Sequence, residues 1–107
     1  MSAEELKNVL IQALEDIKAI DTVVIDVSSL TPLTDYIIVT SGRSTRHIKA
    51  IADHALEAAK LHGVTALGVE GEQGSEWVLV DLGDVVVHAM LPAVREYYQL
   101  EKLWSVS

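Results

Sequence analysis

The sequence contains neither cysteine nor phenylalanine. Without cysteine, the chain forms no disulfide, no thiolate metal site and no cysteine nucleophile. No apolar run approaches the length of about 20 residues that spans a bilayer, so no membrane partner is expected. Apolar residues make up 50% of the chain and aromatic ones are few, so the core of this 107-residue domain is predicted to be aliphatic.

Basic residues are also scarce. Eight lysines and arginines stand against sixteen aspartates and glutamates, which gives a net charge of -8. This balance argues against nucleic acid as a partner, because phosphate contacts need clustered Lys and Arg. It favours a basic protein partner, since opposite charges accelerate encounter. The acidic N-terminus has the character of neither a signal peptide nor a transit peptide, so a cytosolic (cytoplasmic) protein is expected.

The stretch Glu76–Met90 predicts a β-hairpin at the centre of the fold. Its two valine-rich runs meet at Leu82-Gly83, where glycine can take the positive φ of a tight turn. With these two residues as the loop, the expected pairs are Asp81 with Asp84, Val80 with Val85, Leu79 with Val86, Val78 with Val87 and Trp77 with His88. Alternation gives an all-valine core face and a mixed face that carries Trp77, Leu79, Asp81, Asp84, Val86 and His88. A bulge at Gly83 would shift this register by one residue and exchange the faces of one strand.

The remaining pattern alternates helices and strands around that hairpin. Helices are predicted over residues 2–19, 44–61 and 92–98, and strands over residues 22–27, 35–40 and 68–70. Ser2 and Glu5 form a capping box, Ser44 is the expected N-cap of the second helix, and Pro92 is the expected first residue of the third. The order favours a single α/β (α+β) domain over residues 1–107, a mixed sheet with most helices on one face.

Three polar groups are candidates for chemistry, and each has a structural alternative. Residues 42–47 could bind an anion at a helix N-terminus, but a capped helix whose basic residues pair with the chain's own carboxylates is favoured. Asp81 and Asp84 could hold Mg²⁺, or they could simply suit a turn. The histidines form no ligand set, because His47 and His54 lie about 10 Å apart on one helix. Neither a metal nor a cofactor is expected.

Three aromatic side chains, Trp77, Tyr98 and Trp104, are candidates for a protein interface. Trp and Tyr are enriched in interface hot spots, where one anchor is worth about 2 kcal/mol or more. The alternative is that all three are buried inside the domain. Trp77 shares its predicted sheet face with His88 and Asp81, and this composition differs from the valine face behind it. We therefore favour a partner-binding surface.

A series of short motifs runs from about Leu6 to Trp104: Asp35-Tyr36, Ser41–Ser44, Arg46-His47, Ile51–Asp53, Gly68–Gly71, Glu76–Asp84, Val87-His88, Arg95, Tyr98, Leu100-Glu101 and Leu103-Trp104. This series resembles the ribosomal silencing factor family (RsfS, also called Iojap). The resemblance implies a nucleotidyltransferase-like topology without enzyme activity. It also implies binding to the fourteenth protein of the large ribosomal subunit (uL-fourteen), which obstructs joining of the small subunit and represses translation when nutrients are short or growth slows.

The resemblance further implies a partner-binding surface that maps, motif by motif, onto Trp77, Asp81, His88, Arg95, Tyr98, Leu100, Glu101 and Trp104. A basic ribosomal protein would supply lysines and arginines for Asp81 and Glu101, while Trp77 and Tyr98 would be the apolar anchors. Such a repressor acts by steric exclusion and needs no catalytic residue.

Two alternatives remain at this point. A Mg-dependent nucleotidyltransferase-like enzyme is disfavoured because Arg43 interrupts the Gly-Ser pair of such enzymes, and because Asp81 and Asp84 do not alternate on one strand. A homodimer through the exposed hairpin face is the other, since an uncovered tryptophan would invite self-association.

Overall fold

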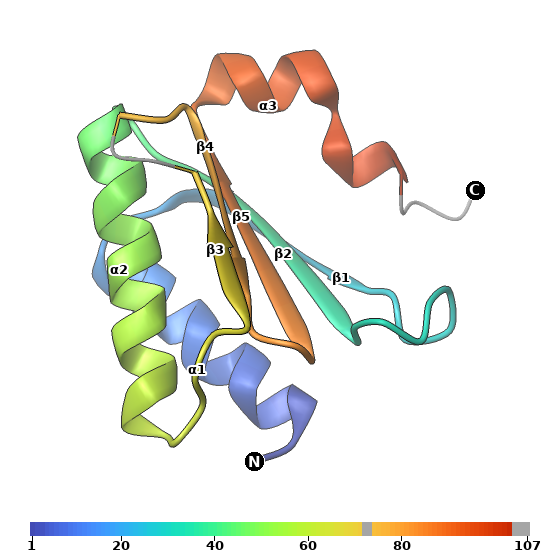
Figure 1. The fold of residues 1–107 in the computed structure, drawn as a ribbon. Coiled ribbons are helices and arrows are strands. Elements are labelled where there is room, and N and C mark those ends of the chain that lie inside the picture. Colours follow the sequence, from blue (N-terminus) through green and yellow to red (C-terminus); the bar gives the residue numbers. More distant parts are fainter. Residues whose placement is uncertain (72–73, 104–107) are drawn as a thin grey trace.

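The computed structural model describes residues 1–71 and 74–103. In chain order its elements are α1 (Ala3–Asp16), β1 (Ile20–Asp26), β2 (Tyr36–Ser41), α2 (Thr45–Leu61), β3 (Gly68–Glu70), β4 (Trp77–Asp81), β5 (Val85–Met90), α3 (Pro92–Tyr98) and the 3-10 helix η1 (Leu100–Leu103). The strands form a mixed sheet in the order β1-β2-β5-β4-β3 (Figure 1), in which β2 and β5 are parallel and the other neighbours are antiparallel. The predicted mixed α/β fold is confirmed, while its relation to nucleotidyltransferases stays a prediction.

The helices begin where the sequence predicts them to begin. Ser2 Oγ accepts the N–H of Glu5, and the Glu5 carboxylate accepts the N–H of Ser2, each at 3.1 Å. Ser44 Oγ caps α2 by accepting the N–H of His47. Side chains thus satisfy backbone donors that the first helical turn leaves free. Within residues 1–71 and 74–103, no helix is long and apolar enough to cross a membrane.

The main core lies between the sheet and the pair α1 and α2, which cover the same face (Figure 1). Its fully or nearly buried members come from both helices and from three central strands: Leu6, Leu10, Leu14, Ile38, Ile48, Ile51, Ala52, Ala55, Ala59, Val78, Val80, Leu82, Val85, Val87 and Ala89. Alanines on α2 let this helix lie close to the strands. The prediction that the valine face of the hairpin is core is confirmed.

The hairpin register differs from the predicted one. Asp81 pairs with Val86, Leu79 with His88 and Trp77 with Met90, so the predicted pairs are wrong by two residues. The turn is made by Gly83 and Asp84, because Leu82 donates its N–H to the carbonyl of Val85 at 2.9 Å. Leu82 is 5% exposed, and placing it in the loop would have exposed its side chain and lost the free energy gained by its burial. A shift by an even number of residues leaves each side chain on its predicted face, so the mixed face still carries the residues predicted for it.

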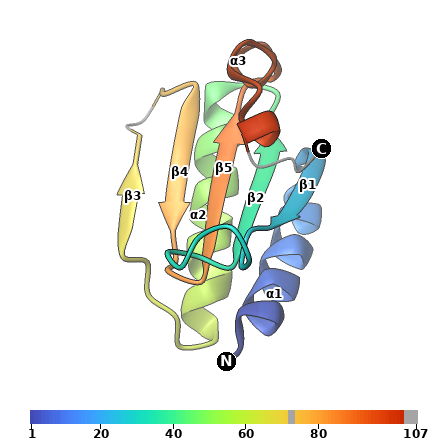
Figure 2. The same ribbon diagram turned by 90° about the vertical axis from the view of Figure 1, so that its right-hand side faces the viewer.

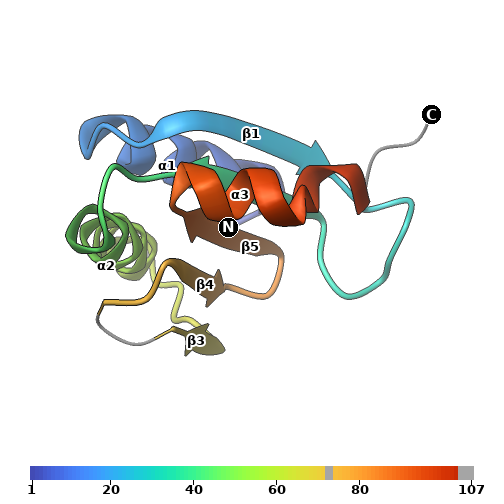
Figure 3. The same cartoon turned by 90° about the horizontal axis from the view of Figure 1, so that it is seen from above.

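The opposite face of the sheet is covered only in part. There α3 and η1 cross one end of β2 and β5, as seen in Figures 2 and 3, and a second small core forms beneath them. That core consists of buried Val27, Ile37, Val39 and Met90, with Ile25, Trp77, Val94 and Leu100 packed against it. In Figure 2 no helix lies in front of β3 or β4. The mixed hairpin face therefore continues into a surface beside α3.

Candidate functional site

Four rings meet where the start of β4 approaches the end of α3. We call Trp77, His88, Tyr97 and Tyr98 the aromatic cluster. The Trp77 ring centroid lies 5.8 Å from that of His88 and 5.1 Å from that of Tyr98, and Tyr97 and Tyr98 stand edge to face at 5.0 Å. Such tilted and edge-on pairs are favourable ring geometries. Since Tyr97 is 81% and Tyr98 56% exposed, the cluster presents aromatic surface to solvent.

His88 is the buried member of the aromatic cluster and sets the orientation of Trp77. The indole N–H of Trp77 donates to Nδ1 of His88 at 3.0 Å, so that nitrogen carries no proton. Burial lowers the pKa of His88 from 6.5 to about 4, because the charged imidazolium loses its hydration there. A neutral histidine is thus the acceptor that holds the indole against Tyr98.

Arg95 ties α3 to both neighbouring segments. Its Nε donates to Glu101 Oε1 at 3.0 Å, and its Nη1 donates to Ser41 Oγ at 3.1 Å. The Arg95 side chain is only 12% exposed and that of Glu101 34%. Because the guanidinium is engaged on two sides, Arg95 positions η1 against the end of β2. Glu101 keeps part of its carboxylate accessible.

The segment after α3 is held to the sheet by packing as well as by that ion pair. Gln99 ends the helix in a left-handed conformation with φ of 47°, which turns the chain back over the sheet. Leu100 then packs on the second core, while Leu103 is 72% exposed. On the other side of Trp77, the cluster borders a shallow hollow of about 240 Å³ lined by Glu70, Gly71, Trp77 and Leu79.

Asp81 lies apart from the cluster. It shares a sheet face with Trp77 but is four residues farther along β4, about 13 Å away. Its Oδ1 accepts the N–H of Gly83 at 2.9 Å, so one oxygen shapes the turn, and Asp84 is exposed within that turn. Among the described residues no group of three or more His, Asp or Glu side chains is arranged to hold a metal ion. Trp104 lies outside the described residues.

The entry to α2 is occupied by its own histidine. His47 Nδ1 accepts the N–H of Arg43 at 3.0 Å, so Nε2 carries the proton and donates to the carbonyl of Ile17 at 2.8 Å. The ring therefore joins the end of α1 to the start of α2. Capping by Ser44 is confirmed, but the expected pairing of Arg43 and Arg46 with carboxylates is not seen in the part of the chain that the structure describes.

The structure thus brings together Trp77, His88, Tyr98, Arg95, Leu100 and Glu101 and leaves Asp81 at the far end of the strand. The sequence analysis did not single out the exposed Tyr97 or the exposed Leu103 as members of this surface. The signal for Tyr97 was its neighbour, since adjacent residues on a seven-residue helix cannot both point into the core. No sequence signal linked Ser41 to Arg95, which is 54 residues away.

Comparisons with known proteins agree on one family. The family model described as "Ribosomal silencing factor during starvation" matches residues 1–107. A protein of Chromobacterium violaceum named "Ribosomal silencing factor RsfS" is 50% identical over 105 residues, which are 98% of this chain and 86% of that protein. A crystal structure of a Chromobacterium violaceum protein, 48% identical, superposes with a TM-score of 0.94 over 100% of this chain and 92% of the other. The mouse protein named "Mitochondrial assembly of ribosomal large subunit protein 1" is 36% identical over 92% of this chain and 45% of its own length.

Proposed function

The chain belongs to the ribosomal silencing factor family, and from this premise we propose that it represses translation by binding the large ribosomal subunit and keeping the small subunit from joining. The observation that carries the proposal is the aromatic cluster, whose two tyrosines are exposed beside the face of the sheet that α1 and α2 leave free. The names of the matched relatives, one of which refers to assembly of the large subunit, supply the class of target.

The cluster has the composition of an interface hot spot. Buried Trp and Tyr anchors carry much of the energy at protein interfaces, especially when their rotamers are fixed before binding. Here the indole of Trp77 is fixed by His88 and by Tyr98, so little side-chain entropy remains to be lost. The surrounding hollow beside Leu79 gives a partner's apolar side chain a place to insert.

Acidic side chains frame this surface. Glu70 lines the hollow and Glu101 lies within η1, on a chain whose net charge is -8. A basic protein is the complementary partner, and the rRNA phosphates around it would repel the rest of the molecule. We propose uL-fourteen as that partner, with contacts to Trp77, Tyr98, Leu100 and Glu101. Arg95 and His88 support those contacts from below.

The bound protein then inhibits subunit joining by its volume alone. The bound protein occupies space that the small subunit needs, and no bond is made or broken. The proposal accordingly assigns no catalytic residue, cofactor or metal. Asp81 lies about 13 Å from Trp77, so it would extend the contact along the hairpin instead of joining its centre.

Co-sedimentation with purified large subunits, followed by a subunit-joining assay, tests this proposal. Tyr98→Ala removes an aromatic anchor that is 56% exposed, so the fold should keep its thermal stability. We expect affinity for large subunits to fall about tenfold, or about 1.4 kcal/mol, and monosome formation to recover in parallel. Trp77→Ala should weaken binding at least as much, but it also removes a half-buried side chain from the second core.

Leu61→Ala is the matched control, because it truncates a side chain that is 78% exposed on the helix-covered face. This variant should sediment with large subunits as the parent does. If Tyr98→Ala also sediments as the parent does, the aromatic cluster is not the contact surface. If the parent protein leaves subunit joining unchanged, the proposed mechanism is wrong.

A further inference from the structure

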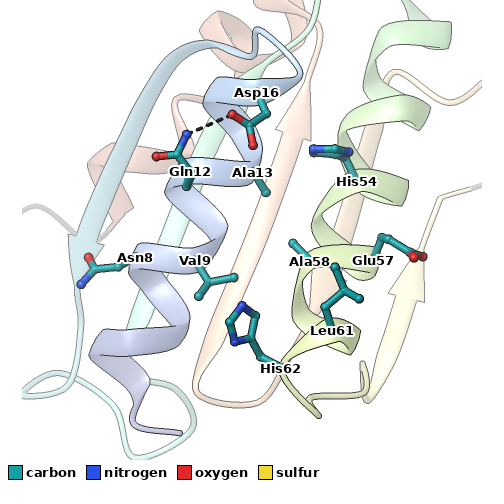
Figure 4. A pocket seen from close by; sticks show the side chains of 10 residues that line it. All are labelled: Asn8, Val9, Gln12, Ala13, Asp16, His54, Glu57, Ala58, Leu61 and His62. Atoms are coloured by element: carbon teal, nitrogen blue, oxygen red, sulfur yellow. Dashed lines mark hydrogen bonds between the residues drawn. The ribbon is translucent and has the colours of Figure 1, made fainter.

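A groove runs between α1 and α2 on the solvent side of the helix layer, away from the aromatic cluster. Figure 4 shows the ten side chains that line its volume of about 550 Å³. Its apolar part comes from both helices and consists of Val9, Ala13, Ala58 and Leu61. The polar part consists of Asn8, Gln12, Asp16, His54, Glu57 and His62.

Leu61 is the most unusual member of the groove. Its side chain is 78% exposed in the last turn of α2, although the buried stripe of that helix is made of Ile48, Ile51, Ala52, Ala55 and Ala59. Leu61 therefore contributes little to the core. Together with the half-exposed Val9 and Ala58 it makes an apolar strip across two helices, and such a strip is typical of a protein contact.

The carboxylates among the lining residues are those of Asp16 and Glu57. Asp16 stands at the end of α1 and Glu57 projects from the outer side of α2 (Figure 4), and the lining includes no lysine or arginine. Two of the lysines on these helices are engaged elsewhere. Lys7 lies 4.9 Å from the centroid of the Tyr36 ring, and Lys49 pairs with Asp53 at 2.8 Å. A ligand in the groove would meet the Asp16 carboxylate at the end of α1, and a ligand wide enough to cover α2 would also meet Glu57.

We propose that this groove binds an amphipathic helix of a basic partner protein, with apolar residues on the Val9 and Leu61 strip and lysines or arginines beside Asp16 and Glu57. A third helix packs well over the valley between two others, because its side-chain ridge fits that valley. The imidazoles of His54 and His62, which extend from α2 toward α1 in Figure 4, supply hydrogen-bonding atoms along the valley.

The acidic residues of the groove favour a basic helix over two other ligands, a second copy of this chain and an anionic membrane. A second copy would bring the same carboxylates face to face, and an anionic membrane would meet them with its phosphates. The lysines or arginines of a basic helix would instead be attracted to Asp16 and Glu57. Figures 1 and 2 show α1 and α2 on one face of the sheet and α3 on the other, so a helix bound between α1 and α2 leaves the aromatic cluster free. The proposal is therefore independent of ribosome binding.

The test uses the full chain and a fluorescein-labelled peptide of about 16 residues with leucines at i, i+3, i+4, i+7 and i+11 and lysines beside them. Fluorescence anisotropy should show binding at least about tenfold tighter than that of a peptide with the same composition and dispersed leucines. Leu61→Asp should weaken binding about tenfold, and Asp16→Asn combined with Glu57→Gln should weaken it and reduce its salt dependence.

Leu33→Asp is the control, because it makes the same substitution at a leucine that is 85% exposed outside the groove. It should bind the striped peptide as the parent does. Equal binding of the two lysine peptides, or equal loss in Leu33→Asp and Leu61→Asp, overturns the proposal. So does self-association that Leu61→Asp abolishes, or binding of the parent to phosphatidylserine vesicles, since either result assigns the groove to another occupant.

Discussion

His88 links the pH dependence of folding to the aromatic cluster. Its pKa is lowered from 6.5 to about 4 because burial strips the charged imidazolium of its hydration. The same ring accepts the indole N–H of Trp77. Below pH 6.5 the unfolded chain therefore binds a proton that the folded chain rejects, and stability falls as the pH falls toward 4. At about 1.4 kcal/mol per pH unit, this one group should cost about 2 kcal/mol between pH 7 and pH 5.

The substitution that isolates this effect is His88→Asn. The side-chain oxygen of asparagine can take the place of Nδ1 as acceptor for Trp77, but asparagine does not titrate in this range. Urea unfolding of both proteins at pH 7, 6 and 5 gives the free energy of unfolding at each pH. The variant should be less stable at pH 7, since it packs less volume, and should lose about 2 kcal/mol less on going to pH 5.

Taking the difference between the two proteins cancels the titration of the acidic residues, because both chains carry them. His62→Asn, which removes an exposed histidine at the end of α2, is the control and should keep the slope of the parent. Parallel curves for the parent and His88→Asn would refute the idea that His88 is neutral through its burial. The indole orientation would then need another cause.

Three further predictions concern the segments that hold the sheet and the site together. Gly71→Ala should destabilise the fold by about 1–3 kcal/mol in thermal unfolding, because φ at this position is +113° and an added Cβ would lie 2.8 Å from a carbonyl oxygen of β4. Gly68→Ala is the control and should cost less than about 1 kcal/mol, because no atom beyond the neighbouring residues lies within 4 Å of the added Cβ. His47→Phe should cost about 1–3 kcal/mol in urea unfolding, because it leaves a backbone N–H and a carbonyl without their partner. Arg95→Lys should accelerate amide hydrogen exchange in η1, since lysine cannot reproduce both bonds of the guanidinium, and equal exchange rates would show that the pairing with Glu101 does not hold this segment.

The local elements could be predicted because their causes are local. The capping box of Ser2 and Glu5 fixes the start of α1, and Pro92 suits the first turn of α3, so both helices begin where expected. The valine face of the hairpin was also predictable, since alternation divides the side chains whatever the pairing. Even the incorrect register preserved this division, because the error was an even number of residues.

The errors came from interactions whose energy depends on the folded environment. The turn shifted because burying Leu82 and bonding Asp81 to the N–H of Gly83 outweighed the simpler two-residue loop. The contact of Arg95 with Ser41 bridges 54 residues, and no periodicity reports a contact of that kind. His47 was considered for an anion site, yet its ring completes backbone hydrogen bonds at both of its nitrogens.

For Trp77 the sequence posed a choice between core and interface, and the structure shows that the two roles are compatible. One edge of the indole packs on the second core, its N–H is held by His88, and its other neighbour is the exposed Tyr98. A surface anchored in this way is ordered before any partner arrives, which lowers the entropic cost of binding. Loss of His88 or Arg95 should therefore weaken binding without removing a contact, and such supporting residues would resemble contact residues in a simple binding assay. Amide hydrogen exchange in η1 distinguishes Arg95 from a contact residue such as Tyr98. Removing Tyr98 should leave the exchange rates in η1 unchanged, whereas removing Arg95 should increase them.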